Sequence, residues 1–350
     1  YPHNSGAYSN FRKCPLDNGI PNLFTQLKQE GYKTSLFGKC HFAPVPYGDT
    51  RADKTLPYDD FKAYYESLGI DQLVLEDDKQ VSVWFYDDYS KEMDQKGLLK
   101  PYRDDVWDNS KQKVFPFPGP AEAHPDAWVG RKSATYLHAC KADEQPQFVW
   151  ISFSGPHYPF DAPQAYWDKV DREKLPPMKY REGELSGMDR IHHKSYYGGG
   201  NIDGCGMAKD HGCKNYTPEY WEDLRVSYHA NVKLIDDQVG EILAAVRNVY
   251  GENALIIFTA DHGEMLGNHG LWGKHNCGYE EVWHIPLIVQ FPGQQAAESR
   301  KELVNSTDLF PTCVSFAGGN LPAGDGMSLT DREHLQKRGY TFAEGEGYLA

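Results

Sequence analysis

Residues with the chemistry of a metal and anion site follow one apolar segment of the sequence. Residues 254–258 are apolar and strand-like, and Asp261, His262 and Lys274 come after them with several glycines between. A carboxylate beside an imidazole can bind a divalent cation, and an ammonium group can bind an anion. Because open α/β sheets bind ligands at the carboxyl ends of their strands, we predict a site for a metal and an anion here.

Two other apolar segments end in a similar way. Lys39 and His41 follow a predicted strand at 33–37, and His157 follows one at 147–154. Each residue has an ordinary alternative: Lys39 could be a solvated loop lysine, His41 a capping or packing histidine, and His157 part of a turn between prolines. The repetition of the pattern after three strands favours chemistry, since an imidazole transfers protons near neutral pH.

The elements that must position these loops alternate along the chain. Apolar residues recur at helical spacing in some segments, and branched and aromatic residues gather in short runs in others. The predicted strands are 33–37, 147–154, 254–258 and 286–291, and the predicted helices include 23–30, 126–141 and 218–250. Strands that alternate with helices indicate an α/β fold with a largely parallel, helix-covered sheet.

Size and charge narrow the class of protein. The chain has 350 residues, of which 40% are hydrophobic and 25% charged, and its net charge is −14. This size suits one large α/β domain or two unequal ones. The negative charge argues against nucleic acid and anionic membrane surfaces as partners. No apolar run reaches the roughly eighteen residues of a membrane span, so we expect no transmembrane segment.

The loops and their order resemble the sulfatase family of the alkaline-phosphatase-like superfamily. Residues 31–41 are similar to the family's GYxT…GKxH signature, and residues 156–159 to its PHxP loop. Residues 261–274 resemble DHGExLGxHGxxGK, and residues 279–288 resemble YEExxxxPLI. These matches run in the family's order across nearly the whole chain.

The resemblance implies a fold and a division of the chain. The fold would be α/β, with an alkaline-phosphatase-like central and mostly parallel sheet flanked by helices. Residues 1–318 would form the sulfatase catalytic domain, and residues 319–350 would begin a smaller C-terminal subdomain. The middle stretches of the sequence match no signature of the family.

The resemblance also implies a role for each candidate residue. Lys39 and Lys274 would hold the sulfate oxygens and help the leaving oxygen depart. His41 would steady the nucleophile, and His157 would protonate the leaving alcohol.

Asp261 and His262 would bind a divalent cation. The resemblance implies Ca²⁺ first, although Ca²⁺ usually takes oxygen ligands. Mn²⁺ and Zn²⁺ are the alternatives, because imidazole suits them better.

The nucleophile of this family is the hydrate of a formylglycine, made from a Cys or Ser in a CxPSR element. That element should precede a segment like residues 1–6, and none of the seven cysteines lies in such a context. The strand that supplies the family's first pair of aspartate ligands is also not found in the sequence. We therefore expect an N-terminally truncated fragment of a sulfatase-like protein.

The resemblance implies a sulfuric ester hydrolase that cleaves a small-molecule or carbohydrate sulfate ester. Phosphate and sulfate are nearly isosteric tetrahedral anions, so a phosphodiesterase or phosphonate monoester hydrolase of the same superfamily is an alternative. A sulfatase-like protein that binds without catalysis is a third possibility.

Several remaining residues have plainer interpretations. Cys205, His211 and Cys213 provide too few ligands for a closed zinc site, and a disulfide or free thiols fit them better. His269 and His275 could reach the substrate or lie on the surface.

Two runs of side chains are expected to serve the fold. We expect the acidic residues 76–78 to form a solvated surface. The aromatic residues between 84 and 128 are expected to pack in the core rather than to bind sugar.

We predict that this chain alone does not hydrolyse an aryl sulfate at saturating Ca²⁺. The expected nucleophile and two expected carboxylate ligands are not in its sequence. Release of the phenol by rigorously purified protein measures this, and turnover well above the uncatalysed rate would contradict the prediction.

Overall fold

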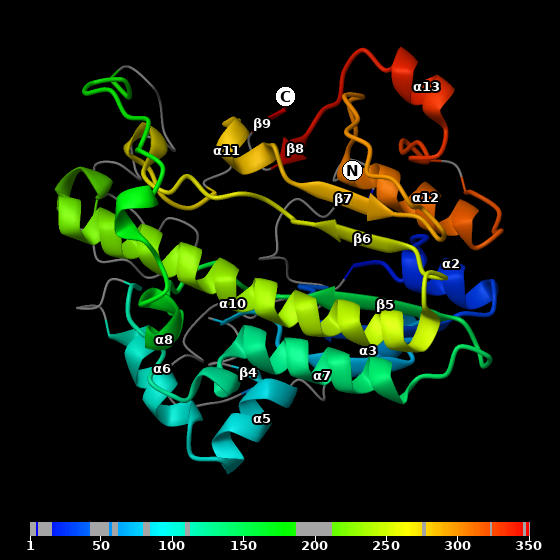
Figure 1. Ribbon diagram of the computed structural model, residues 1–350, viewed down its shortest axis with the longest axis horizontal. Helices are drawn as coiled ribbons and strands as arrows, with labels where there is room; N and C mark the ends of the chain where they lie inside the picture. Colours follow the sequence, from blue (N-terminus) through cyan, green and yellow to red (C-terminus); the bar gives the residue numbers. More distant parts are fainter. Residues whose placement is uncertain are drawn as a thin grey trace.

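The computed structural model describes most of the chain and shows an α/β architecture (Figure 1). The described residues are 5, 16–42, 56–57, 62–79, 85–108, 113–186, 212–274, 278–322, 324–345 and 348–349.

A three-stranded parallel sheet forms the centre of the fold. Its middle strand is β1 (Lys33–Gly38), which pairs with β3 (Gln72–Leu75) on one side and β5 (Gln147–Ser152) on the other. All residues of β1 after Lys33 are buried, as expected for a central strand. The predicted strands at 33–37 and 147–154 are therefore confirmed.

Helices cover both faces of this sheet. Leu36 packs in a cluster with Phe24 of α2 (Leu23–Gln29), whereas Phe37 packs in a cluster with Val129 of α7 (Pro125–Ala139). Since successive side chains of a strand point to opposite faces, α2 and α7 lie on opposite sides of the sheet. The long helix α10 (Pro218–Tyr250) packs against α7, and Figure 1 shows the two running side by side.

The ends of α10 follow from its sequence. The side chain of Thr217 accepts a hydrogen bond from the backbone N–H of Tyr220, and Pro218 occupies the first turn, where its missing N–H costs nothing. Gly251 ends the helix with a φ of 60°, a conformation that suits glycine. The predicted helix 218–250 is confirmed.

A second sheet has two strands, and these are antiparallel, whereas the sequence predicted a largely parallel sheet. The predicted strands at 254–258 and 286–291 form β6 (Ile256–Thr259) and β7 (Leu287–Gln290), but the pair is antiparallel. The described residues between them form no crossover helix; they include the loop of Asp261 and Lys274 and the short α11 (Glu280–Trp283). A return of this kind leads back to an adjacent antiparallel strand.

Buried aromatic residues lie in the described parts of the segment between residues 84 and 128. Tyr89, Tyr102 and Trp128 are all buried, so the expectation that aromatic residues between 84 and 128 pack in the core is confirmed for these three. The remaining elements are β2 (Leu56–Pro57), α3 (Lys62–Ser67), β4 (Phe85–Tyr86), α5 (Asp88–Gln95), α6 (Leu99–Trp107), α8 (Gln164–Trp167), α12 (Leu309–Phe316), α13 (Arg332–Lys337), β8 (Glu344–Gly345), β9 (Tyr348–Leu349) and 3₁₀ turns at 121–123, 172–174, 213–215, 268–270 and 306–308.

The C-terminal residues fold onto the segment before them. Asp308 is fully buried, forms an ion pair with Arg338, and accepts a hydrogen bond from the backbone of Met327. The division at residue 318 remains a prediction. Among the described helices, none is long and apolar enough to cross a membrane.

Replacing Glu92 with Gln should lower the free energy of unfolding by about 1–2 kcal/mol at pH 7. Glu92 on α5 bonds to Lys132 and to the indole N–H of Trp128 on α7, and to Lys96. Burial opposes the charge of this carboxylate, but Lys132 and its other donors lower its pKa to about 2.

This pKa lies below the unfolded value of about 4.3, so the stabilisation is complete above that value and is lost as the pH falls towards 2. In urea unfolding, the difference between the two proteins should narrow between pH 7 and pH 3. Glu144→Gln, in an exposed pair with Lys141, should change stability by less than about 0.5 kcal/mol. An equal effect of Glu92→Gln at both pH values would contradict the assignment.

Candidate active site

The loops that follow β1, β5 and β6 bring all six predicted site residues together. Lys39 Nζ lies 3.7 Å from Asp261 Oδ2, and His262 Nε2 lies 3.5 Å from the same oxygen. The rings of His157 and His262 are 6.0 Å apart, and Lys274 Nζ lies 2.9 Å from His157 Nε2. The sixth residue, His41, follows Lys39 in the loop after β1. The grouping arises because these strand ends share one region of the fold.

His157 is held in one tautomer by its own loop. Its Nδ1 lies 2.8 Å from the carbonyl oxygen of Tyr158, and a carbonyl can only accept, so Nδ1 carries the hydrogen. Nε2 then presents a lone pair, which accepts a hydrogen bond from Lys274. Burial and, next, the Lys274 ammonium hold the pKa of His157 well below its ordinary value. The imidazole is therefore neutral at pH 7 before an anion binds.

His262 has a buried lone pair with no hydrogen bond. Its Nδ1 donates to the carbonyl oxygen of Gly263 over 2.8 Å, which leaves Nε2 as the acceptor nitrogen. Nε2 is buried and has no hydrogen-bond partner among the described residues. Burial, followed by the charge of Lys274, lowers the pKa of His262 to about 4. A neutral, oriented imidazole with an open lone pair is the form that ligates metals.

Asp261 and His262 fit a divalent cation as two of its ligands. Although burial alone would raise the pKa of Asp261, Lys39 and then His262 hold it well below the ordinary value. A charged carboxylate and a neutral imidazole suit Mn²⁺ or Zn²⁺, and also Ca²⁺ if oxygen ligands complete the shell. The described part of the chain contains no group of three or more His, Cys, Asp or Glu placed to hold a metal. The pair therefore needs ligands from elsewhere.

Asp78 is a site residue that the sequence interpretation missed. Its Oδ2 lies 3.4 Å from His41 Nε2 and 3.7 Å from Lys39 Nζ, and its side chain is only 5% exposed. Burial opposes the charge, but His157, Lys39 and His41 hold its pKa well below the usual value. The expectation that residues 76–78 are solvated is wrong, because all three are buried.

A signal for this acidic run was present in the sequence. Residues 76–78 directly follow β3, as the predicted site residues follow β1 and β5. Asp77 holds the neighbouring loop, since its Oδ1 accepts hydrogen bonds from the backbone N–H groups of Cys40 at 2.9 Å and His41 at 2.8 Å. His41 has a φ of 52°, a left-handed conformation that is uncommon for residues other than glycine. The Asp77 carboxylate stabilises this turn, which presents Lys39 and His41.

Glu76 is also buried, but its pKa is raised, whereas that of Asp78 is lowered. It accepts a hydrogen bond from Ser154 at the end of β5. Burial and, next, the carboxylate of Asp126 raise the pKa of Glu76 well above its ordinary value. The neutral form of Glu76 is therefore favoured more than it is for an exposed glutamate, and the side chain joins the ends of β3 and β5.

His269 lies in the loop between β6 and Lys274 and contacts Glu184 and Tyr279. Its Nδ1 lies 3.2 Å from Glu184 Oε2, and its ring stacks on that of Tyr279 with centroids 4.2 Å apart. These contacts give His269 a structural position. His275 lies outside the described residues.

The expectation that Cys205, His211 and Cys213 provide a disulfide or free thiols, and no closed zinc site, stays a prediction. Cys205 and His211 lie outside the described residues, whereas Cys213 is buried in a cluster with Trp272. Burial raises the pKa of the Cys213 thiol to about 12.

The fold and the site together define the class of protein. The structure is similar to that of the phosphonate monoester hydrolase from Silicibacter pomeroyi, with a TM-score of 0.67, 23% identity and coverage of 95% of this chain and 64% of that one. It is also similar to a protein solved in complex with its substrate D-glucosamine-2-N,6-O-disulfate, with a TM-score of 0.58, 15% identity and coverage of 94% and 67%. The fold is the alkaline-phosphatase-like α/β fold, as predicted.

The family model for sulfatases matches residues 1–319, so this chain belongs to the sulfatase family of hydrolases. It is 28% identical over 338 residues to the multifunctional alkaline phosphatase superfamily protein PehA of Trinickia caryophylli, which covers 90% of this chain and 61% of the relative. It is 27% identical over 354 residues to the choline-sulfatase of Rhizobium meliloti, which covers 94% and 59%. The chain thus spans about three fifths of the length of these relatives.

Replacing Asp78 with Asn should lower the free energy of unfolding by about 2 kcal/mol at pH 7. The change removes a buried negative charge that lies beside Lys39 and His41. Chemical denaturation measures the effect, and Asp104→Asn, in an exposed pair with Lys100, serves as the control and should cost less than about 0.5 kcal/mol. Equal stability of the two variants would show that the Asp78 carboxylate does not hold these groups.

Proposed function

We propose that the whole protein is a sulfuric ester hydrolase. The observation that carries the proposal is the chain of contacts from Lys39 through Asp261, His262 and His157 to Lys274. It joins two ammonium groups, a pair of potential metal ligands and an imidazole at one site. An anionic ester in contact with cationic groups is stabilised where charge develops during its cleavage.

In this proposal Lys39 and Lys274 bind the sulfate oxygens. Burial would lower the pKa of Lys39, but Asp78 and then Asp261 raise it above its ordinary value, so the ammonium is charged. Its charge is held in place before substrate arrives, and it needs no reorganisation during the reaction. Lys274 approaches from a different loop, through its contact with His157.

His157 is the proposed general acid for the leaving alcohol. Burial and, next, its contact with Lys274 hold the pKa of His157 well below its ordinary value while the site contains no anion, so the ring is neutral. A bound sulfate ester offsets the charge of Lys274, and a nearby negative charge favours the protonated imidazole. Substrate binding would thus raise the pKa of His157 and allow it to deliver a proton to the departing oxygen.

His41 is the proposed residue that steadies the nucleophile. Its Nε2 lies 3.4 Å from Asp78 Oδ2, which fixes the direction of the ring. We take the nucleophile to be a formylglycine hydrate outside residues 1–350. The described cysteines support this choice, because burial raises the pKa of Cys40 well above its ordinary value and that of Cys313 to about 11.

Asp261 and His262 are the proposed ligands of a divalent cation, Ca²⁺ or alternatively Mn²⁺ or Zn²⁺. Such a cation would supply Lewis-acid polarisation of the sulfate and orient it. Nε2 of His262 supports this assignment, because it is buried beside Asp261 and makes no hydrogen bond among the described residues, which is costly for a polar atom.

The proposed substrate is a small-molecule or carbohydrate sulfate ester. A relative in this fold was solved with a sulfated glucosamine as its substrate, and another sequence relative is a choline-sulfatase. The net charge of −14 disfavours nucleic acid as a partner.

A phosphonate monoester or phosphodiester is the alternative substrate. Phosphonate monoester hydrolases share the fold, and the relative PehA is described as multifunctional. The arrangement of Lys39, Lys274 and the potential metal ligands would hold a tetrahedral phosphorus group as well as a sulfate. Activity towards both classes of ester therefore distinguishes the two substrates.

In the full-length protein, Lys39→Ala and Lys274→Ala should each lower kcat/KM for an aryl sulfate by about a hundredfold, because each removes a charge that stabilises the transition state. Steady-state kinetics with an aryl sulfate and a phenyl phosphonate ester, side by side, measure this. Lys100→Ala is the control, since Lys100 is 82% exposed and lies in a surface ion pair with Asp104.

Hydrolysis of the phosphonate ester alone would favour the alternative substrate. Similar kinetics for Lys39→Ala, Lys274→Ala and Lys100→Ala would show that the anion site is elsewhere.

A further inference from the structure

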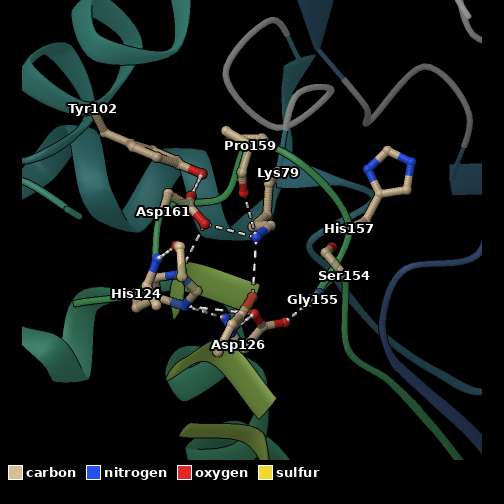
Figure 2. Close-up of polar contacts among 12 residues, drawn as sticks. Lys79, Tyr102, His124, Asp126, Ser154, Gly155, His157, Pro159 and Asp161 are labelled. Carbon is tan, nitrogen blue, oxygen red and sulfur yellow. Dashed lines mark hydrogen bonds and ion pairs between the residues drawn. The ribbon is translucent and has the colours of Figure 1, made fainter. Parts of the chain in front are cut away.

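A charged network lies behind the site, and none of its members belongs to the proposed reaction. Lys79, His124, Asp126 and Asp161 are all fully buried. Lys79 Nζ lies 2.6 Å from Asp161 Oδ1 and also donates to Asn231 Oδ1 at 3.2 Å. Figure 2 shows Lys79, His124, Asp126 and Asp161 beside the loop that carries His157. Buried charges are costly unless they are paired, so a network of this kind needs an explanation.

Lys79 binds one end of the loop that carries His157. Its ammonium donates a hydrogen bond of 2.8 Å to the backbone carbonyl of Pro159, two residues after His157. Lys79 also donates to Oδ1 of Asp161, which lies two residues after Pro159 in the same segment. The hydroxyl of Tyr102 donates to the other oxygen of the Asp161 carboxylate at 2.6 Å. Burial opposes the charge of Asp161, but Lys79 and then His124 lower its pKa to about 2.

The other end of the loop is bound by Asp126. The backbone N–H of Gly155 donates to Asp126 Oδ1 at 2.8 Å, and Asn231 donates to Asp126 Oδ2 at 2.9 Å. Asn231 also accepts from Lys79, so one side chain of α10 connects the two attachments. A Cβ atom on Gly155 would collide with Asp126 and Asn231, which shows how closely the network fits this backbone.

We propose that Lys79 is a positioning residue for His157: by holding the backbone at Pro159 and Asp161, it sets the direction of the imidazole towards Lys274. The hydrogen bond from Lys274 to His157 Nε2 is 2.9 Å long and depends on that direction. The imidazole and the ammonium come from different loops, so a shift in the His157 loop would separate them. The kinetic part of this inference rests on the proposed function, whereas the geometric part does not.

Removing both charges of the Lys79–Asp161 pair distinguishes a role in positioning His157 from a role in stability alone. Loss of Lys79 alone leaves Asp161 buried without its ammonium partner and should destabilise the fold. Lys79→Met combined with Asp161→Asn removes both charges and should recover much of that stability. If the network only stabilises the fold, function should return with stability; if it positions His157, function should stay low.

The test uses the full-length protein with Lys79→Met, with Lys79→Met/Asp161→Asn, and with Arg338→Met as the matched control. Arg338 forms a buried ion pair with Asp308 in the C-terminal segment, outside the site and its loops. Kinetics are measured with the better of the two esters, and stability by thermal unfolding. ¹⁵N spectra of the histidine rings are also recorded, and the signals of His157 are assigned by comparison with His157→Gln.

We expect the double variant to lose at least tenfold in kcat, with KM changed less than threefold. We also expect its His157 Nε2 signal to move towards that of an imidazole without a hydrogen bond. Arg338→Met should lose stability but keep the kcat and the His157 signal of the parent. A double variant with the parent's kcat and His157 signal would overturn the inference, even if Lys79→Met alone fails to fold.

The two proposals can fail separately. If the parent protein hydrolyses neither ester, the proposed function is wrong, and the ring spectra still decide whether Lys79 orients His157. If the parent is active and the His157 signal does not move in the double variant, the positioning role is wrong and the proposed function stands.

Discussion

The ammonium group of Lys39 lies 3.7 Å from both Asp78 and Asp261, and the rest of the site depends on this shared charge. The two carboxylates keep the lysine charged, and the lysine in turn keeps both carboxylates ionised. Lys39 and Asp78 are buried, and burying either charge alone would be costly; the Asp261 side chain is 67% exposed and adds a second negative charge beside Lys39. The partners come from the ends of β1, β3 and β6, and the electrostatics therefore couple these loops.

In contrast to Lys39 and its carboxylate partners, the histidines His157 and His262 are kept in their neutral form. Burial and the charge of Lys274 keep His157 and His262 neutral, while backbone carbonyls fix the hydrogen of each ring on Nδ1. Both rings therefore present a lone pair at Nε2. The lone pair of His157 accepts a hydrogen bond from Lys274, and that of His262 has no hydrogen-bond partner among the described residues. A site that combines fixed positive charge with oriented lone pairs suits an anion and a metal together.

A second set of buried charges supports this arrangement from behind. Lys79, Asp161 and Asp126 hold the backbone on both sides of His157 (Figure 2). Asn231 of α10 joins Lys79 to Asp126. The helix pair α7 and α10 supplies Asp126 and Asn231, so the packing that covers the sheet also fixes the loop. In this way the position of one imidazole depends on contacts between residues that are far apart in the sequence.

The sequence by itself determined the elements that have strong local signals and the residues that lie in recognisable loops. The spacing of apolar residues predicted β1, β5, α7 and α10, because each has a clear period and clear end signals. It also selected the six site residues, since each follows a strand. It did not predict the antiparallel β6–β7 pair, or that residues 76–78 are buried. Strand pairing and the burial of an acidic run depend on partners distant in the chain, such as Lys39 for Asp78 and Ser154 for Glu76, and only the tertiary structure brings them together.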